Sequence, residues 1–200
     1  MGQRLVVTVS NYGEEIAKIY YHWSAYSISA LCEARDIINV LYDDGNEEKD
    51  LRLRLIRFCE NNGGGIDGGE GSDEWNRITE MYPNEKFKTD NISRNNGLIA
   101  LSKKGMEDIQ YWSEGDIYIN LDENEVINNV NDYYDNLDSY NKFRSEWDDS
   151  YKPLTLNDIP NINFDLCEVS VFDIDEVILK LESLNGYVCR NGNDIYELIA

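Results

Sequence analysis

Two apolar runs near the N-terminus decide the expected fold: Arg4-Leu5-Val6-Val7-Thr8-Val9 and Ile16-Ala17-Lys18-Ile19-Tyr20-Tyr21-His22-Trp23. Both are rich in the β-branched and aromatic residues that favour strands. Between them, Asn11-Tyr12-Gly13 supplies the residues that tight turns prefer. This stretch therefore predicts an N-terminal β-hairpin, and the rest of the chain is interpreted around it.

Side-chain alternation assigns the two faces of this hairpin, because successive residues of a strand point to opposite sides. One face carries Leu5, Val7, Val9, Ala17, Ile19, Tyr21 and Trp23, and the other carries Arg4, Val6, Thr8, Lys18, Tyr20 and His22. A five-residue loop over 11–15 places Thr8 opposite Lys18, Val6 opposite Tyr20 and Arg4 opposite His22; a two-residue shift keeps the faces but changes these partners. We expect Trp23 in the core and His22 on the more polar face.

The remaining periodicity predicts an α+β fold, in which helices pack on a largely antiparallel sheet. Apolar residues recur at helical spacing, with capping residues nearby, in five segments, namely 26–42, 49–59, 73–81, 103–113 and 174–184. Short apolar or alternating runs predict further strands at 97–102, 116–121, 164–172, 186–190 and 194–198. On the second helix, Lys49, Arg52, Arg54 and Arg57 are expected to form a solvated basic face.

Two hundred residues fit a single domain, 1–200, and two segments of it have unusual composition. Residues 61–72 are rich in glycine, and Gly63, Gly65 and Gly68 match G-x-G-x-x-G. A predicted helix precedes them where a dinucleotide site needs a strand, so we interpret the segment as a mobile loop. Residues 122–150 form an acidic segment rich in Tyr and Asn, with nine acids against two bases.

The charge is strongly negative and unevenly distributed. The chain carries 39 acidic and 18 basic residues, a net charge of −21; residues 1–100 contribute −6 and residues 101–200 contribute −15. Such a field repels nucleic-acid phosphates and favours basic partners. An equally simple interpretation is that the acids only keep the protein dissolved.

Other compositional features argue against several kinds of site and location. No apolar run reaches the ~20 residues that a membrane helix needs, and no leader-like segment opens the chain, so we expect a cytoplasmic protein. The four cysteines, Cys32, Cys59, Cys167 and Cys189, are far apart. With one histidine and no ligand-like spacing, neither a metal site nor a cofactor is expected.

Two motifs resemble a family of uncharacterised proteins of phages and mobile elements. The opening Met1-Gly2-Gln3-Arg4 and the run Tyr20-Tyr21-His22-Trp23-Ser24-Ala25-Tyr26 are similar to the family's Met-Gly-x-Arg start and its Tyr-x-His-Trp-x-x-Tyr motif. The segment Asn96 to Met106 is similar to a Gly-Leu-Ile-Ala block of the same family. Ser24 stands where the family more often has Asp, and Ser27 where it has Pro or Gly. The resemblance implies a phage or mobile-element origin and the rough fold.

Charge and origin together suggest an anti-defence protein. In this hypothesis the chain acts as a DNA mimic in the host cell, like an anti-restriction or anti-CRISPR protein, and binds the basic groove of a nucleic-acid-binding host protein, such as a CRISPR effector. It binds no nucleic acid itself. The expected partner-binding residues are acids and aromatics of the acidic segment, namely Asp122, Glu123, Glu125, Asp132, Tyr133, Tyr134, Asp135, Asp138, Tyr140, Glu146, Asp148 and Asp149.

The alternative is a small hydrolase-type enzyme centred on His22. Histidine is the side chain best suited to general base catalysis near neutral pH, and Ser24 and Arg4 are expected nearby. Against this hypothesis, no G-x-S-x-G or comparable setting for a nucleophile occurs. A lone histidine beside a tryptophan is more often a structural hydrogen-bonding residue.

Overall fold

The computed structural model describes residues 3–25, 27–43, 45–130, 141–142, 144–146, 149–153 and 188–191. The strands are β1 (Leu5–Asn11), β2 (Glu14–Tyr21), β3 (Gly65–Ile66), β4 (Leu98–Ala100), β5 (Gly115–Asn120), β6 (Glu125–Asn129) and β7 (Val188–Asn191). The helices are α1 (Ser27–Leu41), α2 (Leu51–Asn61), α3 (Asp73–Met81) and α4 (Lys103–Gln110). The expected helix at 174–184 and the strands at 164–172 and 194–198 lie outside the described residues.

The strands form one mixed sheet in the order β3-β4-β2-β1-β5-β6-β7. Pairing is antiparallel for β1–β2, β2–β4 and β5–β6, and parallel for β1–β5, β3–β4 and β6–β7. The antiparallel ladders join more residue pairs than the parallel ones, so the predicted α+β fold with a mostly antiparallel sheet is confirmed. Strand β6 begins within the acidic segment, where sequence periodicity predicted no strand.

The hairpin forms as predicted over most of its length. Thr8 pairs with Lys18 and Val6 with Tyr20. The connection is tighter than expected, because Tyr12 and Gly13 both have positive φ, as a two-residue hairpin turn of this kind requires. A bulge between Val9 and Ser10 absorbs the difference and keeps the predicted faces.

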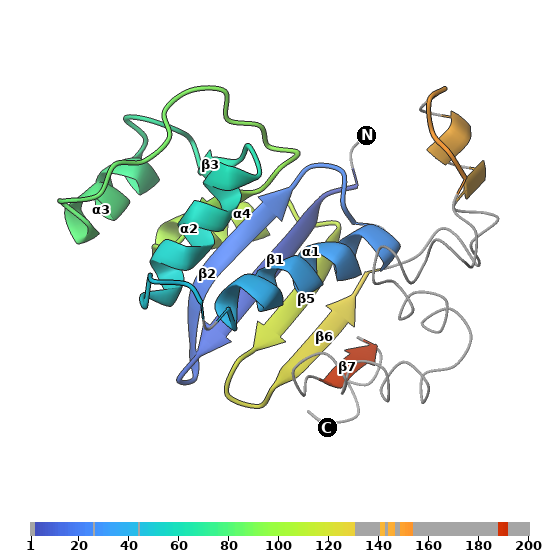
Figure 1. Ribbon diagram of the computed structural model, residues 1–200, viewed down its shortest axis with the longest axis horizontal. Helices are drawn as coiled ribbons and strands as arrows, with labels where there is room; N and C mark the ends of the chain where they lie inside the picture. The colour runs from blue at the N-terminus through green and yellow to red at the C-terminus, as the bar shows by residue number, and fades with distance from the viewer. Residues whose placement is uncertain are drawn as a thin grey trace.

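Helices cover both faces of the sheet (Figure 1). The face of Val7 and Ile19 packs against α1 and α2, and that of Val6 against α4, through Met106 and Ile109. Both sides of β1 are therefore buried, which explains why Val6 and Val7 alike have no exposed surface. Among the described residues, no helix combines the length and apolar character needed to cross a membrane.

Side chains set the beginnings and ends of the helices. Asp50, Ser72 and Ser102 are the N-caps of α2, α3 and α4, and each accepts hydrogen bonds from backbone N–H groups of the first turn. Arg54 lies on the predicted basic face but is buried, so that expectation was wrong for this residue. Its guanidinium donates to the carbonyl oxygens of Val40 and Leu41, and thus caps the end of α1.

Trp23, which was expected in the core, is exposed, and so are two apolar side chains near the ends of the predicted helices 103–113 and 73–81. Trp23 is 42% exposed because β2 ends at Tyr21, where the backbone N–H of His22 turns to the carbonyl of Arg94. Trp112 is 53% exposed because α4 ends two residues before it. Met81 closes α3 and is 48% exposed. For Trp23 and Trp112, the strand or helix ends before the periodic pattern does.

The glycine-rich segment packs closely against the chain. Residues Gly65 and Ile66 form β3, which pairs with β4 at the edge of the sheet. A Cβ atom on Gly64 would lie 1.9 Å from the carbonyl oxygen of Gly97, so only glycine fits at this crossing. The segment after β3 leads through Gly68 and Gly69 into α3, and this turn forms one end of the site described next.

Candidate functional site

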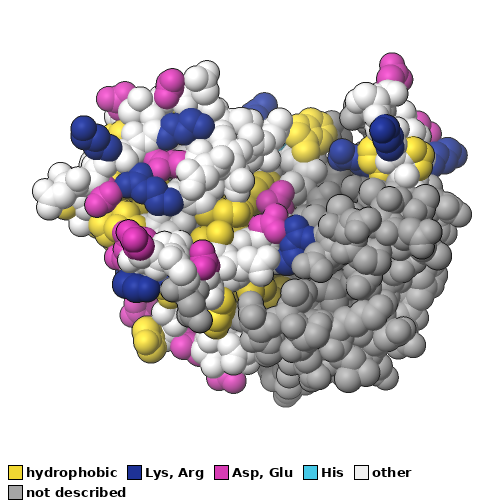
Figure 2. Space-filling model, viewed as in Figure 1, with side chains coloured by type: hydrophobic (Ala, Val, Ile, Leu, Met, Phe, Trp, Pro, Cys, Tyr) yellow, Lys and Arg dark blue, Asp and Glu magenta, His cyan; other side chains and the backbone are white. Residues whose placement is uncertain are grey.

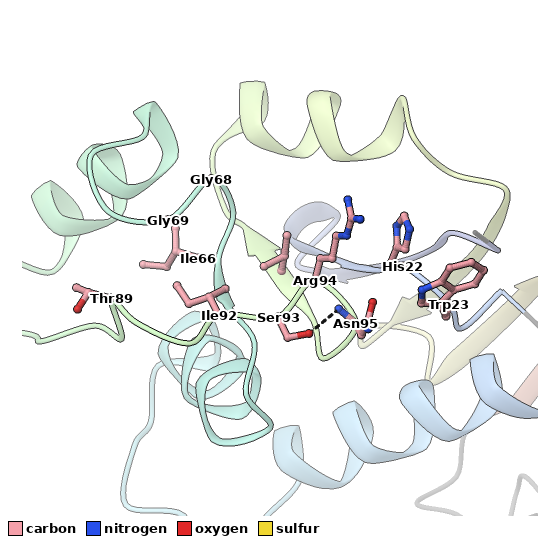
Figure 3. A pocket seen from close by; sticks show the side chains of 11 residues that line it. His22, Trp23, Ile66, Gly68, Gly69, Thr89, Ile92, Ser93, Arg94 and Asn95 are labelled. Atoms are coloured by element: carbon pink, nitrogen blue, oxygen red, sulfur yellow. Dashed lines mark hydrogen bonds between the residues drawn. The ribbon is translucent and has the colours of Figure 1, made fainter. Parts of the chain in front are cut away.

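A large hollow lies beside the end of β2 (Figure 3). Its volume is about 770 Å³, within the range of small-molecule sites. Three segments line it: the end of β2 with His22 and Trp23, the turn after β3, and the loop before β4 with Arg94. Figure 3 shows the side chains of His22 and Arg94 side by side, with Trp23 at one end.

A second, smaller hollow of about 330 Å³ shares His22, Arg94 and Leu98 with the first. Its other lining residues are Arg4, Tyr20, Asp67, Asp108, Ile109 and Trp112. The two hollows are thus halves of one cleft that meet at His22 and Arg94. We call the first the large hollow and the second the small hollow.

His22 is held by its neighbour on the same face of β2. The Tyr20 hydroxyl and His22 Nδ1 are 2.7 Å apart. Burial raises the pKa of Tyr20. A neutral imidazole nitrogen is a better acceptor than a phenol oxygen, so we assign Tyr20 as the donor and place the imidazole hydrogen on Nε2. Burial, and then the positive charges of Arg94 and Arg4, lower the pKa of His22. At neutral pH His22 is a neutral group whose Nε2–H can donate to a ligand.

Arg4 forms the wall of the small hollow and is itself firmly fixed. Its terminal nitrogen donates to Glu114 at 2.9 Å, and its backbone N–H donates to the same carboxylate at 3.0 Å. The guanidinium also lies over the Trp112 ring, 5.6 Å from the ring centroid. The hydrogen bond from Arg4 lowers the pKa of Glu114. Arg4 is therefore largely neutralised, although its buried Nε has no hydrogen-bonding partner among the described residues.

The two hollows differ in charge. Asp67 and Asp108 line the small hollow, and burial raises the pKa of Asp67. Asp108 forms an ion pair with Lys104. No carboxylate lines the large hollow within the described part of the chain, and Arg94 is the one ionised side chain there. The large hollow is therefore the more favourable place for an anion.

The predicted catalytic group is only partly assembled. His22 and Arg4 line the small hollow together, as their expected proximity requires. Ser24 does not join them, because its hydroxyl donates to the Glu33 carboxylate on α1, at 3.2 Å. Ser24 is buried and lies three residues beyond the end of β2, so the alternation that would have placed it beside His22 no longer applies.

The predicted partner-binding residues are described only in part. Asp132, Tyr133, Tyr134, Asp135, Asp138, Tyr140 and Asp148 lie outside the described residues. Asp122 has a structural role, because its carboxylate accepts hydrogen bonds from the backbone N–H groups of Tyr12 and Gly13, each 2.9 Å long. Glu123, Glu146 and Asp149 are exposed, and Glu125 is half-buried on β6.

Sequence reasoning missed several residues of the cleft. Arg94 and Asp67 come from irregular segments with no periodicity to place them, and only the pairing of β3 and β4 beside β2 brings them to His22. Trp112 was expected within the predicted helix 103–113, but α4 ends at Gln110. The cleft as a whole can hold a small anionic or aromatic ligand.

The chain matches no family model, and no curated protein or solved structure is significantly similar to it.

Proposed function

We propose that this protein is an acidic, DNA-mimicking inhibitor from a phage or mobile element. It acts in the host cell by occupying the basic nucleic-acid-binding groove of a defence nuclease, such as a CRISPR effector or a restriction enzyme. The observation that carries the proposal is the net charge of −21, of which −15 belongs to residues 101–200. A groove lined by Lys and Arg is the natural partner of such a field.

Ion pairs within the described part of the chain neutralise only some of its carboxylates. In the described part of the chain, ion pairs use six carboxylates, namely those of Glu15, Asp36, Glu60, Glu85, Asp108 and Glu114. Others, such as Asp50 and Asp122, accept hydrogen bonds from the backbone and stabilise a helix end or a turn. The carboxylates that remain repel one another, and a basic partner relieves that repulsion.

The described surface also indicates where the contact belongs. In Figure 2, acidic side chains lie among basic ones over the described part of the visible face, so the two signs partly offset each other there. The acids of residues 101–200 have few bases among them, 22 against 7. The proposal therefore assigns binding to the acidic segment 122–150, including its tyrosines, which suit protein interfaces.

Charge reversal tests this assignment. In the test variant, Asp132, Asp135 and Asp138 become Lys. In the matched control Glu14, Glu47 and Glu80 become Lys; these acids are exposed and form no hydrogen bond or ion pair with described residues. The protein is used to capture nucleic-acid-binding proteins from host lysate, and duplex DNA is added as competitor.

We expect DNA to displace the captured partner, the test variant to lose it and the control to retain it. Loss in both variants would mean that only total charge matters. Retention in the test variant would refute the assignment to the acidic segment.

The alternative function, a small enzyme, is favoured by one observation: His22 and Arg4 line the same hollow. Ser24 is bonded to Glu33 and supplies no nucleophile there, so a reaction would need water as the attacking group. Partner inhibition that survives in a folded His22→Ala variant supports the binding function. Loss of inhibition in that variant, with the partner still bound, supports the enzyme.

A further inference from the structure

We propose that the large hollow binds a nucleoside monophosphate, with the phosphate between Arg94 and His22 and the base against Trp23. No described residue that lines it belongs to the acidic segment 122–150, which carries the proposed inhibitor function. It sits between the end of β2 and the loop before β4 (Figure 3).

Arg94 provides the charge. Among the arginines whose side chains the structure describes, Arg94 alone has a side chain with no hydrogen bond, ion pair or ring contact to a described residue, whereas the side chains of Arg4, Arg54 and Arg57 are all engaged. Figure 3 shows its guanidinium directed to the same side as the His22 ring. A guanidinium with all its donors available can bind a phosphate through two parallel hydrogen bonds.

His22 adds a directed donor next to this charge. Its Nδ1 is occupied by the Tyr20 hydroxyl, and its Nε2 has no hydrogen bond to any described residue. The backbone bond from the His22 N–H to the Arg94 carbonyl, 3.0 Å long, fixes the two residues beside each other. One cation from the loop before β4 and one neutral N–H donor just beyond the end of β2 thus line the same hollow.

Trp23 supplies the surface for a base. The indole is 42% exposed and stands edge-on to the His22 ring, at 86° and 5.1 Å between centroids. Exposed tryptophan faces beside a cation are the usual platform for a nucleobase. Thr89, Ser93 and Asn95 give the hollow further hydrogen-bonding groups, and about 770 Å³ accommodates a mononucleotide.

The small hollow is a poorer site for the same ligand. Asp67 and Asp108 line it, and Arg4 is paired with Glu114 and stacked on Trp112. The large hollow contains Arg94, whose guanidinium is unpaired among the described residues, and lacks Asp67 and Asp108. The net charge of −21 disfavours anion binding elsewhere on the chain. This contrast directs the phosphate to Arg94.

Isothermal titration calorimetry of the full chain tests the site with AMP, GMP, CMP and UMP as probes. We expect one equivalent of at least one of the four to bind. Arg94→Gln and Trp23→Ala should each weaken that binding about tenfold or more, because the first removes the charge that binds the phosphate and the second removes the surface that stacks on the base. The matched control Arg77→Gln changes an exposed arginine on α3, outside both hollows, and should bind as the original protein does.

Two partial ligands separate the contributions of phosphate and base. Inorganic phosphate and the corresponding nucleoside should each bind more weakly than the monophosphate. Either one binding as tightly as the monophosphate would overturn the two-part site, and so would an Arg94→Gln variant with unchanged affinity. No heat from any of the four nucleotides would overturn the proposal, and leaves the inhibitor function untouched, since that depends on the acidic segment.

Discussion

Replacing Glu33 with glutamine should remove a loss of stability that the protein suffers as the pH rises from 4.5 to about 7. Glu33 lies on α1, and Ser24 Oγ donates to its carboxylate at 3.2 Å. Burial raises the pKa of Glu33 from 4.5 to about 7, and the hydrogen bond from Ser24 offsets this only in part. The Tyr21 hydroxyl also influences the carboxyl, but it lies outside hydrogen-bonding geometry.

The sign of the effect follows from proton binding. Between pH 4.5 and about 7 the folded protein keeps the Glu33 proton, while the unfolded chain has released it. The stability that this proton provides is complete below pH 4.5 and is lost as the pH rises to about 7. At about 1.4 kcal/mol per pKa unit, this interval corresponds to about 3 kcal/mol. Residual solvent contact of the carboxyl reduces it to about 2–3 kcal/mol.

Urea denaturation at about pH 4.5 and about pH 8 measures the effect. The free energy of unfolding of Glu33→Gln, relative to the original protein, should increase by about 2–3 kcal/mol between the two pH values. Other titrating groups cancel in this difference. Glu47→Gln, at an exposed acid, is the control and should show no such increase. An equal difference at both pH values for Glu33→Gln would show that the carboxyl is ordinary and the reasoning wrong.

Three further stability predictions follow from the packing, each measured by urea denaturation. Gly64→Ala should lower the free energy of unfolding by more than about 3 kcal/mol, because the new Cβ meets a backbone carbonyl. In Gly69→Ala the new Cβ meets open space, and the free energy of unfolding should fall by about 1 kcal/mol. Similar losses in the two variants would contradict the close crossing at Gly64. Arg54→Met should lose about 2–4 kcal/mol, because carbonyls at the end of α1 lose their donor; a neutral result would mean that water replaces the guanidinium. Trp23→Ala should lose less than about 1.5 kcal/mol and Ile19→Ala about 2–5 kcal/mol; the reverse order would place Trp23 in the core after all.

The hairpin shows which structural features a periodic sequence pattern can predict and which it cannot. Alternation gave the correct faces, because a register slip of one residue would have exposed the whole apolar set. The expected pairing of Val6 with Tyr20 also holds, although the turn is shorter than the loop from which it was predicted. It could not locate the end of β2, since His22 leaves the sheet through a bond to the distant Arg94. Beyond that contact the alternation no longer applies: His22 still lies beside Tyr20 as expected, but Trp23 is exposed and not in the core.

The same limit applies to the second helix and to the cleft. The pattern predicted Arg54 on a solvated face, but the packing of α2 beside the end of α1 provides carbonyls that bury it. His22, Tyr20 and Arg4 could be grouped from the hairpin alone. Arg94, about seventy residues away, reaches them through strand pairing between β4 and β2, which no local pattern encodes.

The salt dependence of partner binding tests the central claim, that charge in the acidic segment is what binds. The dissociation constant of the purified complex with its captured host partner is measured from about 50 mM to about 500 mM NaCl. If the protein replaces nucleic acid in a basic groove, affinity should fall by at least about a hundredfold over this range. A dissociation constant that stays within about threefold across the range would contradict the account, because an interface of that kind is held together by apolar contacts.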